Sequence, residues 1–318
     1  MNPLVSILIP CFNNEEFVGE AIESALSQTY SNIEVIVVDD GSTDLSLDVI
    51  KRYEKKIKWL TGPNRGACVA RNSALDVSKG EFIQFLDADD LLVPSKIEKQ
   101  IEGIICKNLD IILCKGSLFG DGRPERPIKK PVPNPERSDP VWYFLNFPSG
   151  TNAPLFRRTI IEKVGGFRPN IPRAQEWDLQ VRLASAGARL GLVDEILCRI
   201  RNHSSESRLT KRKISDDYNL KLSLEINEII KMPPYSLSLV GKSSWASHLA
   251  QCSIYAYRNG FREIAKQGFI ESQIWSNSIK INERIFYKIL CYFIPLIYME
   301  RSLGFARAAR NLLKNGQN

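Results

Sequence analysis

Residues 82–90 read Phe-Ile-Gln-Phe-Leu-Asp-Ala-Asp-Asp, an apolar run that ends in three carboxylates within four positions. The apolar part is typical of a strand buried in a sheet. Carboxylates this close repel one another, so they need water, a cation or hydrogen-bond donors around them. Ligands of open α/β sheets bind at this same strand end. The stretch therefore predicts either a site for a divalent cation with the diphosphate of a nucleotide, or an aspartate that caps the next helix.

Strands and helices are predicted to alternate around this stretch. Apolar runs predict strands at residues 5–9, 34–38, 58–60, 81–86 and 110–114. Between them, helices are expected after the caps Asn13 and Asn14, after Asp44, and over 66–77 and 96–106. Such alternation predicts an α/β fold with a mostly parallel sheet flanked by helices.

The second half of the chain is predicted to be less regular. Residues 120–140 hold six prolines and are expected to form an extended surface loop. A strand is expected at 150–156, a helix at 175–186 ended by Gly187, and a last strand at 190–200. Beyond about residue 215 the pattern is wholly helical. We therefore predict two regions, an α/β domain at 1–214 and a helical region at 215–318.

Charge is unevenly distributed along the 318 residues. The net charge is +7, yet residues 204–318 alone hold 17 Lys and Arg against 9 Asp and Glu. Because no nucleic-acid motif accompanies this charge, anionic lipid is the predicted partner. The apolar stretch 285–299, interrupted by Lys288 and Pro295, is either an interfacial helix or a core helix.

Cysteine spacing and the N-terminus indicate the compartment. The seven cysteines include no CxxC pair, so neither a disulfide framework nor a zinc site is predicted. No signal peptide is visible, and no apolar run reaches the roughly 18–20 residues that span a bilayer. A cytoplasmic protein is predicted, either soluble or peripheral on the inner face of a membrane.

Polar residues follow other predicted strands as well. The turn at 10–14 lacks the glycines of a dinucleotide or P-loop fingerprint, which excludes a Rossmann dehydrogenase, but its Phe12 can stack on a base. Asp40 can accept hydrogen bonds from a base or ribose, or serve only in a turn. Arg71 can contact base or phosphate, or pair with Asp40 or Asp87.

Four segments resemble glycosyltransferase family 2, whose members are inverting enzymes with the GT-A fold. They are Val-Ser-Ile-Leu-Ile-Pro at 5–10 with Asn13, Val-Val-Asp-Asp-Gly-Ser at 37–42, Gly-Ala-Cys-Val-Ala-Arg-Asn at 66–72, and Phe-Leu-Asp-Ala-Asp-Asp at 85–90. The resemblance extends over roughly residues 4–203, and residues from about 215 onward resemble no family that we can name.

The resemblance implies a role for each matching donor-site residue. Asp40 is expected to hold the nucleobase, with Pro10, Phe12 and Arg71 nearby, and Asp87 to face the ribose. Two other residues of the acidic stretch are assigned as well: Ala88 to donor binding and Asp89 to a Mn²⁺ or Mg²⁺ ion that bridges the diphosphate.

The remaining roles fall later in the chain. Residues 175–178, Gln-Glu-Trp-Asp, resemble the family's acid-plus-Trp element, which makes Glu176 the expected catalytic base. Many members have Asp there, so the reach to the acceptor can differ. His203 is similar to a histidine that completes the metal shell in many members, or else is structural. His248 is expected to be structural.

The predicted function is inverting transfer of a sugar from a nucleoside-diphosphate sugar, UDP-sugar favoured, to a hydroxyl of a glycan or lipid-linked acceptor in bacterial polysaccharide synthesis. Glu176 deprotonates that hydroxyl, and the metal stabilises the departing diphosphate. Alternatives are a sugar-1-phosphate nucleotidyltransferase, a phosphatase with Asp87 as nucleophile, and a non-catalytic nucleotide-binding scaffold. The oligomeric state is not predicted.

Overall fold

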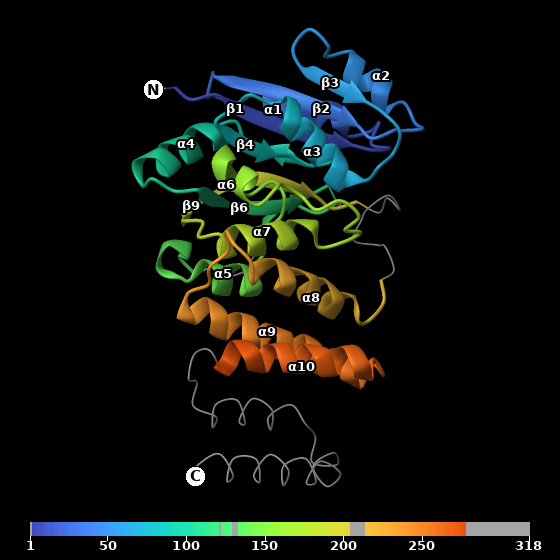
Figure 1. Ribbon diagram of the computed structural model, residues 1–318. Coiled ribbons are helices and arrows are strands. Elements are labelled where there is room, and N and C mark those ends of the chain that lie inside the picture. Colours follow the sequence, from blue (N-terminus) through green and yellow to red (C-terminus); the bar gives the residue numbers. More distant parts are fainter. Residues whose placement is uncertain (1, 121, 129–132, 204–213, 278–318) are drawn as a thin grey trace, which may run out of the picture.

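The computed structural model describes residues 2–120, 122–128, 133–203 and 214–277. These residues form an α/β fold whose nine-stranded sheet has the order β3-β2-β1-β4-β8-β6-β9-β5, with β7 paired to β6 (Figure 1). The strands are β1 (Val5–Cys11), β2 (Ile33–Asp39), β3 (Lys58–Thr61), β4 (Phe82–Phe85), β5 (Leu91–Leu92), β6 (Ile111–Phe119), β7 (Arg126–Pro127), β8 (Leu155–Arg157) and β9 (Leu190–Arg201).

The sheet is parallel where the sequence alternates most regularly. Strands β3, β2, β1 and β4 all run parallel, with Leu8 opposite both Ile36 and Phe85. Strand β8 then runs antiparallel to β4 and to β6, while β6 and β9 are again parallel. The carboxyl ends of β1, β2 and β4 therefore meet at one edge, where the acidic stretch begins.

The helices are α1 (Val18–Leu26), α2 (Ser46–Lys51), α3 (Ala67–Val77), α4 (Lys96–Cys106), α5 (Pro140–Asn146), α6 (Arg158–Lys163), α7 (Gln175–Ser185), α8 (Tyr218–Ile230), α9 (Leu239–Arg258) and α10 (Arg262–Asn277), with a 3₁₀ turn at Pro135–Arg137. The helices predicted over 66–77, 96–106 and 175–186 are confirmed within a residue or two, because their apolar residues recur at helical spacing.

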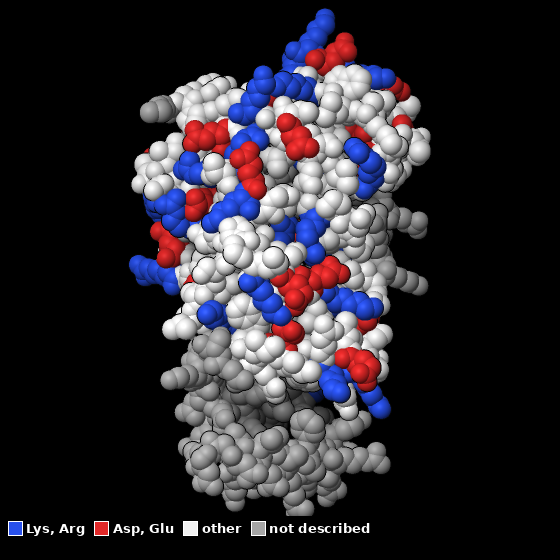
Figure 2. Space-filling view, viewed as in Figure 1, with Lys and Arg blue, Asp and Glu red and all other residues white. Residues whose placement is uncertain are grey.

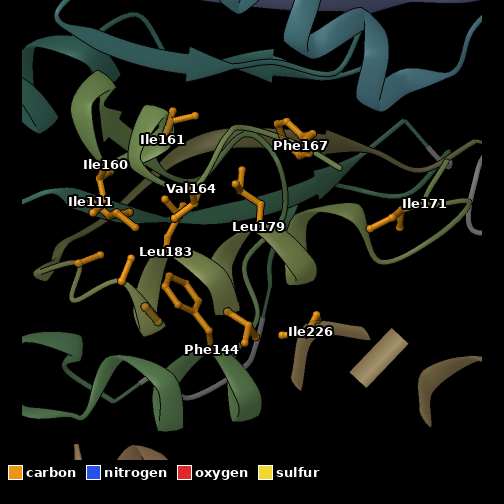
Figure 3. Close-up of a cluster of buried hydrophobic side chains, with 14 of the residues drawn as sticks. Ile111, Phe144, Ile160, Ile161, Val164, Phe167, Ile171, Leu179, Leu183 and Ile226 are labelled. Atoms are coloured by element: carbon orange, nitrogen blue, oxygen red, sulfur yellow. The ribbon is translucent and has the colours of Figure 1, made fainter. Parts of the chain in front are cut away.

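Alternation of side chains along the strands divides the core into two halves. In β1, Ile7 and Ile9 pack with α1, α2 and α4 on one face of the sheet, whereas Leu8 packs with α3 on the other. The second half continues through α6 and α7 to Phe144 of α5 and Ile226 of α8 (Figure 3). One continuous core thus joins the sheet to the helices that follow it.

Helices α8, α9 and α10 lie in succession beyond α5 and α7 (Figure 1). Residues 214–277 hold six Lys and Arg and six Asp and Glu, so the basic surplus of the C-terminal third belongs to residues outside the described ranges. Accordingly, both signs of charge are interspersed on the face shown in Figure 2. Within the described ranges, none of the helices is both long and apolar enough to cross a bilayer. The stretch 285–299 lies outside the described residues.

Several predicted boundaries differ from the structure. Asn13 and Asn14 do not cap α1 with their side chains, because the helix begins only at Val18, and Oδ1 of Asn13 instead accepts a hydrogen bond from the backbone of Thr43. The strand expected at 150–156 is only the short β8, and residues 150–154 form a turn beside the site. Helix α6 and strand β5 were not predicted.

The cysteines of the described residues are all free thiols, in agreement with the absence of a disulfide framework. Cys11, Cys68, Cys114 and Cys198 are buried, whereas Cys106 is exposed.

Candidate active site

A cleft of about 470 Å³ opens at the carboxyl ends of β1, β2 and β4. This volume is in the range of small-molecule sites. The cleft brings together eight of the nine predicted site residues, and His203 lies at its edge through a contact to Asp89. The eight lining residues are Pro10, Phe12, Asp40, Arg71, Asp87, Ala88, Asp89 and Glu176.

One end of the cleft is built by the turns after β1 and β2. Asp40 is buried, and its two carboxylate oxygens accept hydrogen bonds from the backbone N–H groups of Arg65 and Gly66, at 2.9 and 2.7 Å. Each oxygen keeps a further lone pair for a ligand. The adjacent turn needs Gly41, since φ is +73° there and a Cβ would lie 2.6 Å from the backbone N of Asn64. Phe12, 38% exposed, offers its ring to the cleft.

Arg71 of α3 joins the two ends of the cleft. Its guanidinium is buried and donates to Oδ1 of Asp87 at 2.8 Å, to Oε1 of Gln175 at 2.7 Å, and lies 3.2 Å from Oε1 of Glu176. Burial lowers the pKa of Arg71, but the carboxylates of Asp87 and Glu176 outweigh that effect and raise it. Arg71 therefore pairs with Asp87, as one of the sequence alternatives proposed, and not with Asp40.

The acidic turn is held by Asn152, from the segment before β8. Its Oδ1 accepts from the backbone N–H of Asp87 at 2.9 Å, and its amide donates to the buried carboxylate of Asp90. Asp90 also accepts from the backbone N–H of Arg201 at 2.7 Å. Burial, together with the charges of Asp89 and Asp87, raises the pKa of Asp90 well above its usual value. Asp90 is thus a structural link between the turn and the end of β9.

That link places Asp89 beside His203. Oδ2 of Asp89 lies 2.9 Å from Nε2 of His203, and both side chains are partly exposed. A carboxylate oxygen and an imidazole nitrogen on a cleft wall fit Mn²⁺, with substrate oxygens and water left to complete the shell. Among the described residues, no cluster of three or more His, Cys, Asp or Glu is arranged to hold a metal ion. Among the described residues, Asp89 and His203 are therefore the candidate protein ligands of a metal ion.

Glu176 lies in the first turn of α7 and shares Arg71 with Asp87 of the acidic turn. Its Oε1 accepts from Oγ1 of Thr151 at 3.0 Å in addition to its contact with Arg71. No contact to Oε2 is found among the described residues, so this oxygen is available to a ligand in the cleft. Ala174, immediately before α7, has left-handed φ and ψ of 61° and 33°, a sparsely populated conformation that sets the direction in which the helix begins.

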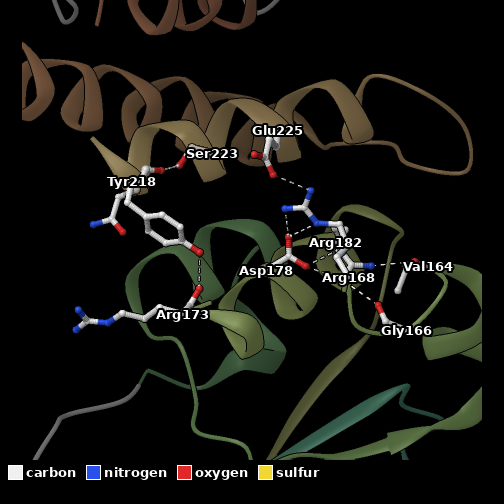
Figure 4. A network of polar contacts seen from close by, with 10 residues as sticks. Val164, Gly166, Arg168, Arg173, Asp178, Arg182, Tyr218, Ser223 and Glu225 are labelled. Atoms are coloured by element: carbon white, nitrogen blue, oxygen red, sulfur yellow. Dashed lines mark hydrogen bonds and ion pairs between the residues drawn. The ribbon is translucent and has the colours of Figure 1, made fainter. Parts of the chain in front are cut away.

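An ionic network around the buried carboxylate of Asp178 joins α7 to α8 (Figure 4). Asp178 accepts from Nε of Arg182 at 3.0 Å and from Nε of Arg168 at 2.9 Å, and Arg168 extends to Glu225 of α8. The carboxylate of Asp178 is thus used inside the protein, away from the cleft. His248 is partly buried and packs against the rings of Trp177 and Trp245, as expected of a structural histidine.

Thr151, Asn152 and Arg173 are among the polar residues of the cleft for which no individual role was predicted. The first two lie in a turn that had been assigned to a strand, and Arg173 precedes α7 in a loop. Each is a single polar residue without a repeated pattern around it. The signal that could have drawn attention to Arg173 is its position three residues before Glu176.

Comparisons with known proteins agree with this geometry. The family model described as "Glycosyl transferase family 2" matches residues 6–165, half of the chain. An uncharacterized glycosyltransferase of Rickettsia typhi is 29% identical over 267 residues, which cover 82% of each chain. The putative teichuronic acid biosynthesis glycosyltransferase TuaG of Bacillus subtilis is 37% identical over 128 residues, 38% of this chain and 50% of TuaG.

Solved structures support the same fold. The crystal structure of residues 1–349 of TarS from S. aureus, in complex with UDP-GlcNAc, superposes with a TM-score of 0.66 at 19% identity and covers 84% of this chain and 79% of that one. The α/β architecture with C-terminal helices is therefore the GT-A fold seen in TarS. By family match, relatives and fold, the chain is a glycosyltransferase and belongs to glycosyl transferase family 2.

Proposed function

We propose that this glycosyltransferase is an inverting enzyme that transfers a sugar from a nucleoside-diphosphate sugar to a hydroxyl group of a glycan or lipid-linked acceptor in bacterial polysaccharide synthesis. The observation that carries the proposal is that Asp89 and Glu176 line one cleft. Asp89, beside His203, can bind a cation that meets the donor's diphosphate. Glu176 has one oxygen, Oε2, that makes no contact with the described residues and can take a proton.

The donor is proposed to be a UDP-sugar. Asp40, Phe12, Pro10 and Arg71 surround the end of the cleft where a base would enter, with Asp87 and Ala88 next along the wall. The ring of Phe12 can stack on a base, and the carboxylate of Asp40 can accept a hydrogen bond from a base N–H. Both interactions suit a pyrimidine nucleotide. TarS, whose fold is shared, has been solved with UDP-GlcNAc and with UDP.

Glu176 is proposed to be the catalytic base. Thr151 and Arg71 hold one oxygen, which leaves Oε2 to take the proton of the acceptor hydroxyl as that oxygen attacks the anomeric carbon. Attack from the side opposite the diphosphate inverts the configuration and needs no covalent sugar intermediate. Because α7 begins one residue earlier, its dipole also favours a negative charge at this position.

Asp89 and His203 are proposed to hold Mn²⁺ or Mg²⁺. When bound, such a cation supplies positive charge for the departing diphosphate. Asp90 and Asn152 keep the pair in position, because they accept hydrogen bonds from the backbone N–H groups of Arg201 and Asp87, respectively. A neutral nitrogen ligand favours Mn²⁺ over Mg²⁺.

We further propose the division into a catalytic domain at 1–214 and a helical region at 215–318. It is supported by the order of the elements, since the last strand ends at Arg201 and α8, α9 and α10 follow. The helical region is proposed to take part in acceptor, membrane or oligomer contacts. Sedimentation with anionic liposomes tests the membrane contact, which would be refuted if the intact chain did not bind.

Release of UDP from a panel of UDP-sugars in the presence of Mn²⁺ tests the proposed reaction. The Glu176→Gln variant should lose roughly 10²–10⁴-fold in rate while its affinity for UDP is kept. Glu54→Gln, at an exposed position outside the cleft, is the matched control. Activity of Glu176→Gln equal to that of the control would exclude Glu176 as the base.

A further inference from the structure

Arg173 differs from the other charged side chains of the cleft. It lines the cleft three residues before Glu176, in the loop that leads into α7. Its backbone is anchored, because its carbonyl oxygen accepts a hydrogen bond from the hydroxyl of Tyr218 at 2.8 Å. Figure 4 shows its guanidinium extending away from Tyr218 and from the Asp178 network.

The other charged groups of the cleft are paired within the protein. Asp40 accepts from two backbone N–H groups, Arg71 is shared by Asp87 and Glu176, Asp89 contacts His203, and Asp90 is bonded to Asn152. The guanidinium of Arg173, in contrast, makes no hydrogen bond or ion pair with the residues that the structure describes. A cation beside a cleft and without an internal partner is available to a ligand.

The position of Arg173 indicates which ligand this is. Phe12, Asp40 and Asp89 line the cleft from the turns that follow strands, where the nucleotide and its diphosphate are expected. Arg173 lines the same cleft from the loop before α7, three residues before Glu176, where the acceptor hydroxyl must lie to lose its proton. An anionic group in contact with Arg173 would therefore be carried by the acceptor.

We propose that Arg173 determines acceptor specificity by binding a carboxylate or phosphate group on the acceptor, which makes an anionic glycan the substrate class of this enzyme. This inference rests on the proposed function. The guanidinium presents two parallel N–H donors that match either anion. Because five carboxylates also line the cleft, an acceptor with a negative charge would be repelled without Arg173.

Binding of three sugars that share one ring tests this inference. They are methyl glucoside, methyl glucuronoside and methyl glucoside 6-phosphate, titrated by NMR into the full-length chain with and without UDP and Mn²⁺. The wild-type protein should bind at least one charged sugar about tenfold more tightly than the neutral one. A preference for the glucuronoside would identify a uronic acid acceptor, and a preference for the phosphate a phosphorylated one.

The variants separate acceptor binding from donor binding. Arg173→Gln should abolish the preference while UDP affinity stays within about twofold. Arg52→Gln, at an exposed site immediately after α2, should keep both. Equal binding of the three sugars, no binding of either charged sugar, or a preference that survives in Arg173→Gln would overturn the proposal. So would a loss of UDP affinity in Arg173→Gln, since Arg173 would then serve the donor.

Failure of the wild-type protein to bind UDP would instead contradict the proposed function, and the titration without nucleotide would still report on Arg173.

Discussion

Asp89 and His203 lie 114 positions apart in sequence, yet Oδ2 of the first is 2.9 Å from Nε2 of the second. The contact depends on Asp90, whose buried carboxylate binds the backbone of Arg201 and so brings the end of β9 to the acidic turn. The two side chains are the proposed protein ligands of the metal.

Replacing His203 with Ala should weaken Mn²⁺ binding by at least about tenfold, because one of two protein ligands is removed. The measurement is the Mn²⁺ concentration that gives half of the maximal UDP binding. Because the nitrogen ligand favours Mn²⁺, the preference for Mn²⁺ over Mg²⁺ should also decrease. An unchanged preference would show that His203 is not a ligand.

Thr151→Val should lower the rate of UDP release about tenfold without a change in UDP affinity. The variant keeps the shape of the side chain but removes the hydrogen bond to Oε1 of Glu176, which costs about 1.5 kcal/mol for a charged acceptor. Thr151→Ser retains the hydroxyl and should restore most of the rate. If the Ser and Val variants were equally slow, the methyl group and not the hydrogen bond would be responsible.

Stability should depend on pH through His248. Burial lowers its pKa from 6.5 to about 4. Between these values the unfolded chain binds a proton that the folded protein does not, so stability is complete above about pH 6.5 and falls as the pH decreases towards 4, by about 3 kcal/mol in total. Urea unfolding at pH 7 and pH 4.5 should show a smaller loss in His248→Gln than in the wild type. Equal losses would contradict this assignment.

Asp178→Asn should destabilise the fold by about 3–5 kcal/mol, because it leaves Arg182 buried without a counter-charge. Glu225→Gln removes an exposed partner of Arg168 and should cost less than about 1 kcal/mol. Thermal or denaturant unfolding of the pair measures the difference. Similar stabilities of the two variants would show that the network contributes little.

Much of the α/β half could be predicted from the sequence, because its signals are local. Apolar runs mark β1, β2 and β4, helical spacing marks α3, α4 and α7, and carboxylates at strand ends indicate the edge where a ligand binds. The direction of β8 could not be predicted, since a three-residue strand carries no periodicity and its pairing with β4 joins residues more than 70 positions apart.

The sequence predicted the acidic residues of the candidate site, but not the residues that hold them in place. Asp40, Asp89 and Glu176 are recognisable because they match family motifs, whereas a single acid at a strand end or helix start can also serve only as a cap or in a turn. Thr151 and Asn152 are polar residues in a turn, and their importance appears only when tertiary packing brings the turn between Asp90 and Glu176. For the same reason the ring contact between Trp177 and His248 could not be inferred from either residue alone.

The most direct test of the central claim is calorimetric titration of UDP, dTDP and GDP, each with Mn²⁺ and with EDTA, into the wild-type protein and Asp89→Ala. Asp194→Ala, which removes an exposed carboxylate from β9, is the control. We predict that UDP binds in the presence of Mn²⁺, and that Asp89→Ala loses this metal-dependent affinity while Asp194→Ala keeps it. Absence of nucleotide binding to the wild type, or binding unaffected by EDTA and by Asp89→Ala, would contradict a metal-assisted nucleotide-sugar site at this cleft.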